Sequence, residues 1–349
     1  MIKELLKDKF TFISIIILLL LYLSILFADF IAPYSKDFFD RTQTYAPPSQ
    51  IFLITEDGKL SRPYTYNYKR EFKSELYQSV YTLDRTNKHY IYIFHKGSEY
   101  KICGIIPCNI HLFGTDKNGR IYLLGTDING RDVFSRLLFG GRISLTIGFL
   151  SLLILFPIGL IYGGISGFIG GLTDVIMMRF AESIMAIPSF YLLIILASIL
   201  PANMTSSQRF TLIVVILALI GWAGFARVVR GMTLSIKNEE YVQAAKTAGA
   251  SSLRIILSHI LPQTTGYVII AMTLSVPSYI LSESGLSFLG LGIQQPDASW
   301  GNMLKDSQEY VNILTRPWLL APGFLIFVSV LAFNIIGDKI RDILDPKEI

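Results

Sequence analysis

The residues best suited to bind a metal ion lie in a short repeated segment of this 349-residue chain. Gly-Thr-Asp-Lys-Asn-Gly-Arg at 114–120 recurs as Gly-Thr-Asp-Ile-Asn-Gly-Arg at 125–131. A calcium loop of the helix–loop–helix type needs oxygen ligands at positions 1, 3 and 5, glycine at 6 and glutamate at 12. Counted from Asp116, position 5 is Arg120 and position 12 is Asp127. The repeat therefore predicts two uses of one tight turn, and no metal site is expected.

Two cysteines and three histidines lie in the same part of the chain. Cys103 and Cys108 enclose the sequence Gly-Ile-Ile-Pro. An oxidising compartment would permit a disulfide between them, and the sequence leaves this open. The histidines at 89, 95 and 111 stand in strand-like runs, which favours packing roles over zinc ligation.

Catalytic patterns are absent from the sequence. No nucleophile has a base at a recognisable spacing, and no Gly-x4-Gly-Lys-Ser/Thr loop is present to hold nucleotide phosphates. We therefore expect a non-enzyme without a cofactor of its own. Charged residues inside apolar runs are functional candidates by default. Asp174, Arg179 and Glu182 favour ion pairing near a membrane interface, whereas Glu283 is a candidate for contact with a solute or for a structural role.

The elements that must position these residues are mostly membrane helices. The chain is 52% hydrophobic and 16% charged, compared with about 25% charged residues in soluble domains. A helix needs roughly 20 apolar residues to cross a bilayer. Six uncharged runs have this length, which predicts an all-α membrane protein with six spans: 10–28, 143–173, 183–208, 210–226, 262–282 and 317–337.

The distribution of lysine and arginine predicts the orientation of these spans. Cytoplasmic loops retain basic residues, and they are frequent at 227–254 and in the C-terminal tail but absent from 201–207. Both termini are therefore expected in the cytoplasm. Three segments precede the core in this topology: a tail with the first span (1–32), a β-rich extracytoplasmic domain (33–123) and an amphipathic interfacial helix (124–142). The helical core with the remaining five spans covers 143–340, and a tail of 341–349 follows.

Turn residues predict the hairpins of the outer domain. Asp-Gly at 57–58, Lys-Gly at 96–97 and Asn-Gly at 118–119 separate strand-like runs. The second copy of the repeat leads into the helix of 124–142, which Asp127 or Asn129 would cap and which Gly140-Gly141 would end.

The most informative segment is the basic inner loop at 238–262. Asn238 is expected to cap a helix that begins with two glutamates and presents a surface of small alanines. Gly249 suits the break, and a second helix would end at Pro262. This helix–turn–helix has too little apolar bulk to form a core alone, which favours docking to a cytoplasmic partner.

This loop resembles the coupling loop of bacterial ABC-importer permeases. The family pattern is Glu-Ala-Ala, three residues, Gly, nine residues and Ile-x-Leu-Pro, and this chain has Gln243-Ala244-Ala245, Gly249 and His259-Ile260-Leu261-Pro262. "LGTDINGRDVFSRLLFGGRISL", "LSESGLSFLGLGIQQPDASWGNML" and "LAFNIIGDKIRDILDP" are similar to the oligopeptide/dipeptide branch. The resemblance covers 124–346. It implies that the residues of loop 229–262 that contact an ATPase are Glu240, Tyr241, Gln243, Ala244, Ala245, Gly249, Ala250, Leu261 and Pro262.

The resemblance further implies the type I importer fold and a multi-subunit assembly in the cytoplasmic membrane of a prokaryote. A second permease subunit, two ATPases that bind ATP and Mg, and an extracytoplasmic substrate-binding protein would be the partners, with peptides as cargo. Nickel or another small solute is the alternative cargo. A stand-alone secondary transporter is the alternative class, but it leaves the docking loop unexplained.

Overall fold

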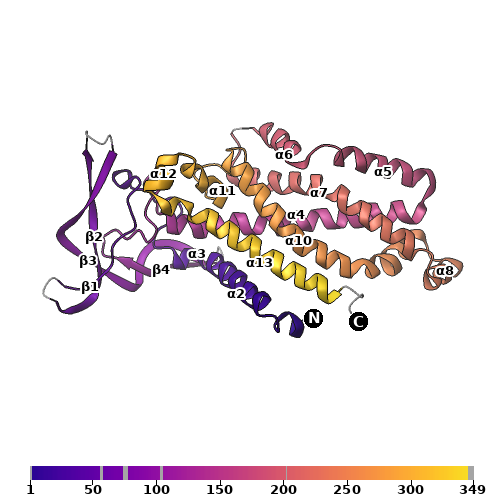
Figure 1. The fold of residues 1–349 in the computed structure, drawn as a ribbon, viewed down its shortest axis with the longest axis horizontal. Helices are drawn as coiled ribbons and strands as arrows, with labels where there is room; N and C mark the ends of the chain where they lie inside the picture. The colour runs from indigo at the N-terminus through magenta and orange to yellow at the C-terminus, as the bar shows by residue number, and fades with distance from the viewer. Residues whose placement is uncertain (1, 56–57, 74–77, 103–104, 202, 345–349) are drawn as a thin grey trace. The chain divides into compact units, whose positions relative to one another are not determined.

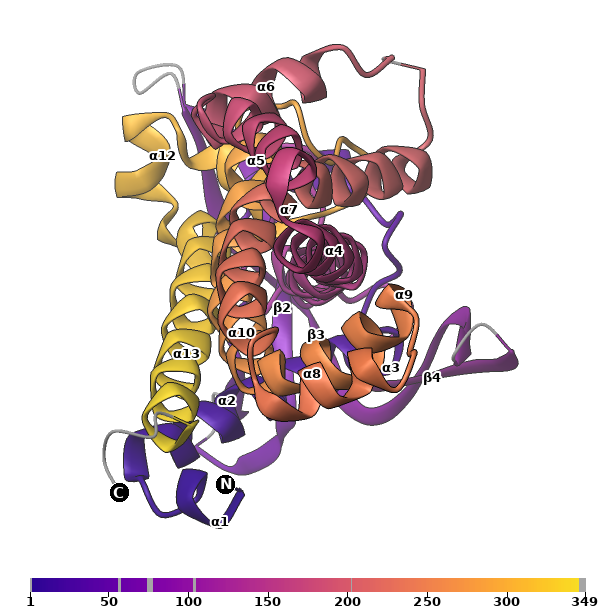
Figure 2. The same cartoon turned by 90° about the vertical axis from the view of Figure 1, so that its right-hand side faces the viewer.

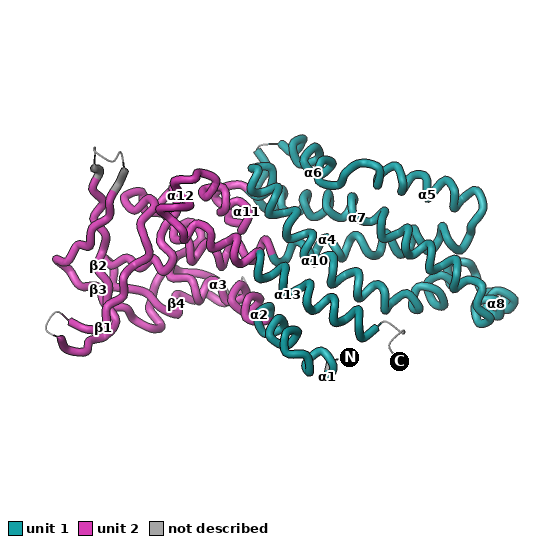
Figure 3. The backbone as a smooth tube through the Cα atoms, in the orientation of Figure 1, with its two compact units in different colours: residues 1–18, 145–293, 327–349 teal, residues 19–144, 294–326 magenta. Residues whose placement is uncertain are grey.

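The computed structural model describes residues 2–55, 58–73, 78–102, 105–201 and 203–344. The chain divides into two compact units (Figures 1 and 3). The first unit comprises residues 1–18, 145–293 and 327–349, and the second comprises 19–144 and 294–326. The first is helical, whereas the second contains all four described strands.

Helices make up most of the described secondary structure. Among the described residues, five helices are long and apolar enough to cross a membrane, and the number is six if a bent pair of shorter helices counts as one span. The long helices are α2 (Lys9–Leu26), α4 (Val133–Ile169), α7 (Ser206–Ile236), α10 (Thr265–Phe288) and α13 (Ala321–Leu344). The shorter ones are α1 (Ile2–Leu5), α3 (Ala28–Ile31), α8 (Glu240–Thr247), α9 (Ser252–Ile255), α11 (Trp300–Met303) and α12 (Tyr310–Thr315). The membrane-protein prediction agrees with this composition.

The bent pair replaces the straight third span predicted for 183–208. It consists of α5 (Gly171–Met185) and α6 (Ser189–Ser198), whose axes differ by 77°. The break falls at Pro188, which has no N–H to donate to a preceding turn and disfavours helical geometry at Ile187. Either the pair is one broken span, or it enters and leaves the membrane on one side.

Helix α4 has no break where a separate interfacial helix was predicted to end. It starts at Val133 and continues through Gly140 and Gly141 for 37 residues, about 55 Å at 1.5 Å per residue. These glycines allow close packing instead of ending the helix. A Cβ on Gly140 would lie 3.3 Å from the backbone of Ser299, and one on Gly141 would lie 3.1 Å from the Trp300 ring. The boundary at residue 142 was therefore wrong.

The two copies of the repeated turn use their aspartates in similar ways. Asp116 Oδ1 accepts the backbone N–H of Gly119 at 2.9 Å. Asp127 Oδ1 accepts the N–H groups of Asn129 at 2.8 Å and Arg131 at 3.0 Å. Neither Asp127 nor Asn129 caps α4. Asp132 does so, because its Oδ2 accepts the N–H of Ser135 at 2.8 Å.

The strands form one antiparallel sheet in the order β1-β2-β3-β4. The strands are β1 (Phe52–Ile54), β2 (Leu60–Lys73), β3 (Gln78–Ile102) and β4 (Ile106–Thr115). Ile54 pairs with Leu60 across the 55–59 turn, where Gly58 has a φ of 76°. The hairpin predicted at Asp57-Gly58 is therefore present, although Asp57 itself lies outside the described residues.

The other two predicted hairpin turns were wrong. Lys96 pairs with Ile110 inside an unbroken β3. Gly97 is required there by packing, since a Cβ would lie 2.6 Å from the His111 ring. The Asn118-Gly119 turn follows β4, and no described strand continues the sheet beyond it. Cross-strand pairing overrode the local turn signal at Lys96-Gly97. At Asn118-Gly119 the turn itself forms, with the N–H of Gly119 donating to Asp116 O at 3.0 Å, but it does not join two described strands.

The histidines pack as predicted. His111 is 2% exposed and its Nδ1 lies 2.7 Å from the carbonyl oxygen of Ala32. His89 is 6% exposed and pairs with Asp116 at 2.7 Å. No three metal-binding side chains cluster among the described residues. Cys103 lies outside the described residues, so the question of a disulfide with Cys108 stays open.

Candidate functional site

The loop at 238–262 folds as two short helices at one end of the first unit, where α8 and α9 lie side by side (Figure 2). The cap residue of α8 is Glu239, one position after the predicted Asn238, and it makes no side-chain cap bond. The chain does not stop at Pro262. It continues through a π turn (Ile256–Ile260) and a 3-10 turn (Leu261–Thr264) into α10. The loop therefore runs without an extended connection from α9 into α10, a membrane helix.

Gly249 closes α8 with a conformation that favours glycine. Its φ is 82°. The N–H of Gly249 donates to Lys246 O, and the N–H of Ala250 donates to Ala245 O, both at 3.1 Å. These are the two hydrogen bonds of a Schellman motif. The turn aligns α9 against α8 and satisfies carbonyl groups that the helix end would otherwise expose.

One face of the loop packs against the membrane helices. Val242, Ile255 and Ile260 are 0–1% exposed and form a small core with Phe168 of α4 and Ile236 of α7. Ala245 and Ala250 pack against the same core. This core holds α8 and α9 to the ends of two membrane helices, so the loop can move with them as a rigid body.

The opposite face is exposed and carries apolar or small side chains. Tyr241, Leu253 and Leu257 are 43%, 56% and 47% exposed. Ala244 and Ala248 are also exposed, and positions 241, 244 and 248 share one helical face by their spacing. We call Tyr241, Ala244, Ala248 and Leu253 the loop surface. Exposed apolar groups outside a span favour contact with a partner.

The remaining predicted site residues occupy several environments. Glu240, Gly249 and Pro262 are exposed, and Leu261 is half-buried. The side chain of Gln243 turns back to α7, where its Nε2 donates to the carbonyl oxygen of Lys237 at 2.8 Å. A glutamate at 243 could not donate this bond, which gives the departure from the family pattern a local reason.

Asp174 forms the ion pair that its sequence context favoured, with a partner, Arg230, that the sequence did not indicate. Asp174 of α5 accepts from the Arg230 Nε of α7 at 2.9 Å and from the Ser166 hydroxyl of α4 at 2.5 Å. Lys237 donates to the carbonyl oxygen of Gly167 at 2.9 Å, where it satisfies the C-terminal end of α4. Arg179 and Glu182 pair within α5, at 2.9 Å on an exposed face. The uncharged run around Asp174 marked it as unusual, but nothing local identified Arg230.

Three glycines bring α4 and α7 into backbone contact. Gly159, Gly163 and Gly167 repeat every four residues, which places them on one helical face. A Cβ on Gly163 would lie 2.4 Å from Ala226 O, and one on Gly167 would lie 2.7 Å from Arg230 O. Small residues at this spacing permit close approach of helices in membranes. The three glycines therefore allow α4 and α7 to pack together closely, next to the loop.

Two family profiles match the chain. The profile described as binding-protein-dependent transport system inner membrane component matches residues 156–349, and the N-terminal TM domain of oligopeptide transport permease C matches residues 1–48. This chain belongs to the binding-protein-dependent transport permease family. The loop surface, Gly249 and the Asp174–Arg230 pair all lie within the first match, whereas 49–155 lies outside both.

Curated relatives agree with this family. The chain is 48% identical over 243 residues to a dipeptide transport system permease protein of Bacillus subtilis, covering 69% of this chain and 70% of the relative. It is 45% identical over 239 residues to an oligopeptide transport system permease protein of Haemophilus influenzae, covering 68% and 71%. A nickel transport system permease protein of Escherichia coli is 38% identical over 237 residues, covering 68% and 79%. This permease is thus a membrane transport protein of the oligopeptide/dipeptide branch.

Glu283 of the permease is fully buried in α10. It accepts the Ser287 hydroxyl at 2.6 Å, and Ser287 Oγ in turn accepts the N–H of Ile293 at 2.9 Å. These bonds tie the segment after α10 to the helix. The burial favours the structural role over contact with a solute in this conformation.

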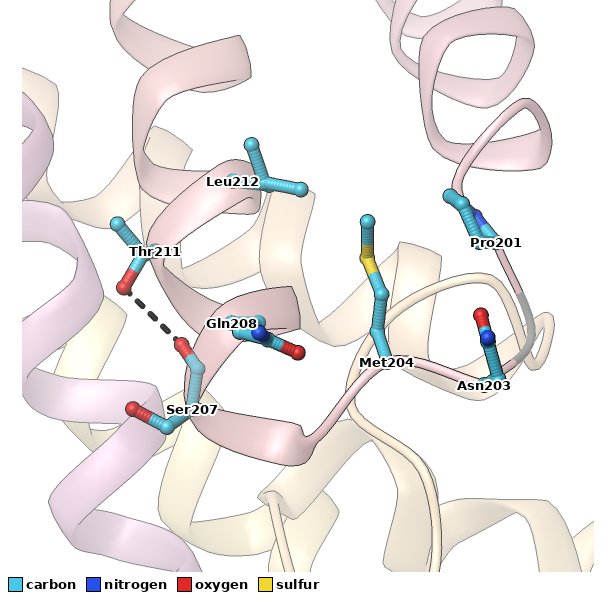
Figure 4. Close-up of a pocket in the computed structure, with 7 residues that line it drawn as sticks. All are labelled: Pro201, Asn203, Met204, Ser207, Gln208, Thr211 and Leu212. Carbon is cyan, nitrogen blue, oxygen red and sulfur yellow. Dashed lines mark hydrogen bonds between the residues drawn. The ribbon is translucent and has the colours of Figure 1, made fainter.

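An open pocket lies at the junction of α6 and α7, and Figure 4 shows its lining side chains. Its volume is about 690 Å³. No charged side chain lines it, which argues against selection of an ion here. The lining residues are Pro201, Asn203, Met204, Ser207, Gln208, Thr211 and Leu212.

Proposed function

We propose that this permease forms half of the translocation pathway of an ATP-driven peptide importer. In this proposal a cytoplasmic ATPase docks on the loop surface of α8 and α9. The observation that carries the proposal is the two-sided construction of the loop. Its inner face is packed on α4 and α7, while its outer face exposes Tyr241 and Leu253. A connector without a partner would gain nothing from exposing them.

Force applied to the loop reaches the membrane helices through rigid contacts. Closure of two ATPase subunits around ATP and Mg would displace α8, and the small core around Val242 would carry the movement to α4 and α7. The Asp174–Arg230 pair then carries it to α5. Such rigid-body motion of packed elements would convert ATP binding into alternating access.

The proposal also includes the orientation of the chain in the membrane and two further partners. The basic residues at 227–254 and in the C-terminal tail support a cytoplasmic location for the loop and both termini. A second permease subunit completes the pathway, and an extracytoplasmic binding protein delivers the substrate. The chain is not an enzyme in this assembly, because its partners hydrolyse the ATP.

The transport systems to which the relatives belong support peptides as the substrate class. The dipeptide and oligopeptide permeases are 48% and 45% identical to this chain, compared with 38% for the nickel permease. Nickel is the second candidate because that relative still covers 68% of the chain.

The experiment is co-purification followed by transport in liposomes. Membranes from cells that express the permease together with its proposed partner subunits would be solubilised, and the permease would be captured through an affinity tag. Wild type is expected to retain the ATPase and to import labelled peptide only with ATP. Ala244→Trp, which adds an indole to the loop surface, is expected to lose both properties while it still inserts in the membrane.

Asn87→Trp is the control, since it adds the same indole to an exposed position of β3 outside the loop. It should retain the ATPase and transport. If wild-type permease purifies alone and moves solute without ATP, it is a stand-alone secondary transporter. Uptake of labelled nickel in place of peptide would overturn the substrate class and leave the coupling proposal intact.

A further inference from the structure

The part of β3 that follows Tyr90 forms a two-stranded ribbon with β4, and this ribbon has exposed apolar side chains. Beyond Tyr90, β3 pairs only with β4. Ile93 and Phe94 are 73% and 65% exposed on β3, and Ile105 and Ile106 are 79% and 61% exposed near the start of β4. A two-stranded ribbon is only marginally stable alone in water. A surface that covers these four residues would therefore stabilise it.

The ribbon contacts the segment that directly follows α2. α2 is a candidate membrane span that ends at Leu26, and α3 follows at Ala28–Ile31. Phe30 of α3 stacks on Phe94, with ring centroids 6.2 Å apart. His111 of β4 contacts the carbonyl oxygen of Ala32 at 2.7 Å. Figure 1 shows β4 beside α3.

These contacts fix the height of the ribbon relative to the bilayer. Phe30 lies four residues beyond the end of α2, or about 6 Å along a helix axis. The headgroup region extends roughly 5–10 Å beyond the hydrocarbon core on each side. The part of the ribbon around Phe94 and His111 is thus held at the level where a membrane surface begins, while Ile93, Phe94, Ile105 and Ile106 stay exposed.

We propose that the β3–β4 ribbon is a membrane-interface anchor whose partner is the lipid surface around α2. Ile93, Phe94, Ile105 and Ile106 insert among the headgroups and the ends of the acyl chains. Interfacial elements bind in this way through an apolar face of limited depth. Lys96 and Lys101 are exposed on the same ribbon, and Glu99 offsets one of their charges, so apolar insertion dominates the contact.

The anchor explains why Phe94, a bulky and exposed residue, adopts a left-handed backbone conformation. Its φ is 56°, a conformation that bulky side chains rarely adopt. In this conformation the ring reaches Phe30 and locks the ribbon to the end of the span. The four inserting residues lie outside both family profiles, and the proposal does not rest on the proposed transport function.

The test uses site-specific fluorescence in the full-length permease. Cys103→Ser and Cys108→Ser remove the two native thiols, and Ile105→Cys introduces one for an environment-sensitive NBD label. The protein is reconstituted in vesicles of equal parts phosphatidylcholine and phosphatidylglycerol. The emission is expected to shift to shorter wavelength and to be lost when doxyl-labelled lipid is included, but to resist aqueous iodide.

Leu60→Cys is the matched control, because Leu60 is an apolar residue of the same sheet that is 87% exposed. Its label should be quenched by iodide and unaffected by doxyl lipid. Ile93→Cys repeats the test on β3 if the Ile105 variant inserts poorly. Iodide quenching of the ribbon labels equal to that at Leu60 would overturn the proposal. So would protection from both quenchers that appears only when partner subunits are added, since that result assigns the ribbon to a protein interface.

Discussion

Arg230 of α7 and Asp174 of α5 form an ion pair that joins two membrane helices close to the loop at 238–262. Arg230 Nε donates to Asp174 Oδ1 at 2.9 Å, and a second guanidinium nitrogen donates to Oδ2. The aspartate side chain is 10% exposed and the arginine side chain 33%. Removing one partner of such a pair destabilises the protein more than removing both, because it leaves an unpaired charge.

Asp174→Ala is therefore expected to destabilise the permease by on the order of 2 kcal/mol. Fully buried pairs lose about 3–5 kcal/mol when one partner is removed, and the exposure of Arg230 reduces this loss. The double variant Asp174→Ala/Arg230→Leu should recover part of the stability, because no unpaired charge remains. Thermal unfolding in detergent measures both. A double variant less stable than Asp174→Ala would contradict this account of the pair.

Gly163→Ala should separate α4 from α7. The new Cβ would lie 2.4 Å from the carbonyl oxygen of Ala226, and overpacking of this kind costs about 1–3 kcal/mol. A lower melting temperature in detergent is the expected result. Gly224→Ala in α7 is the control, since nothing lies within 4 Å of its Cβ. The control should be neutral or stabilising by up to about 1 kcal/mol.

Gly249→Ala should loosen the loop without affecting the rest of the fold. No atom lies within 4 Å of the added Cβ, but the φ of 82° strains any L side chain. The expected cost is about 1–2 kcal/mol, visible as faster hydrogen–deuterium exchange in α8 and α9. Gly249→Asn should have a smaller effect, because asparagine tolerates this region. Gly266→Ala in α10, where space is also open, should leave the exchange unchanged.

Asp306 predicts a pH dependence of stability in the second unit. Burial, together with repulsion from Asp127, raises the pKa of Asp306 from 3.8 to about 6. A carboxyl group with a raised folded-state pKa binds protons more tightly when folded, so its contribution is fully present below pH ~4 and is lost as pH rises towards 6. The shift corresponds to on the order of 3 kcal/mol.

Asp306→Asn removes this titration. Its melting temperature relative to wild type should rise between pH 4 and pH 7, since wild type loses stability over that window and the variant does not. Asp297→Asn is a suitable control: Asp297 lies in the same unit and pairs with Lys36 at 3.3 Å on the surface. Parallel melting curves for wild type and Asp306→Asn across this window would show that the carboxyl group does not titrate there.

Several features could be predicted from the sequence because they depend on short-range chemistry. Apolar composition alone indicated the membrane helices. Glycine and alanine spacing predicted the two helices of the loop and the turn at Gly249, whose φ is indeed positive. The hairpin at Gly58 followed from the same local preferences. The coupling role of the loop stays a prediction, since no partner contact has tested it.

Tertiary packing decided the rest. Glycines that predicted a break or a turn lie inside continuous elements at Gly97, Gly140 and Gly141. Each leaves room for a neighbouring backbone or ring. Asp174 was a visible anomaly, yet its partner lies 56 positions away and is chosen by how α5 and α7 pack. Sequence alone determined that the chain forms long apolar helices and where its loop turns, because those preferences act over a few residues. Which glycines and charges meet was decided only by the tertiary structure, because contact depends on distances between helices that no local preference encodes.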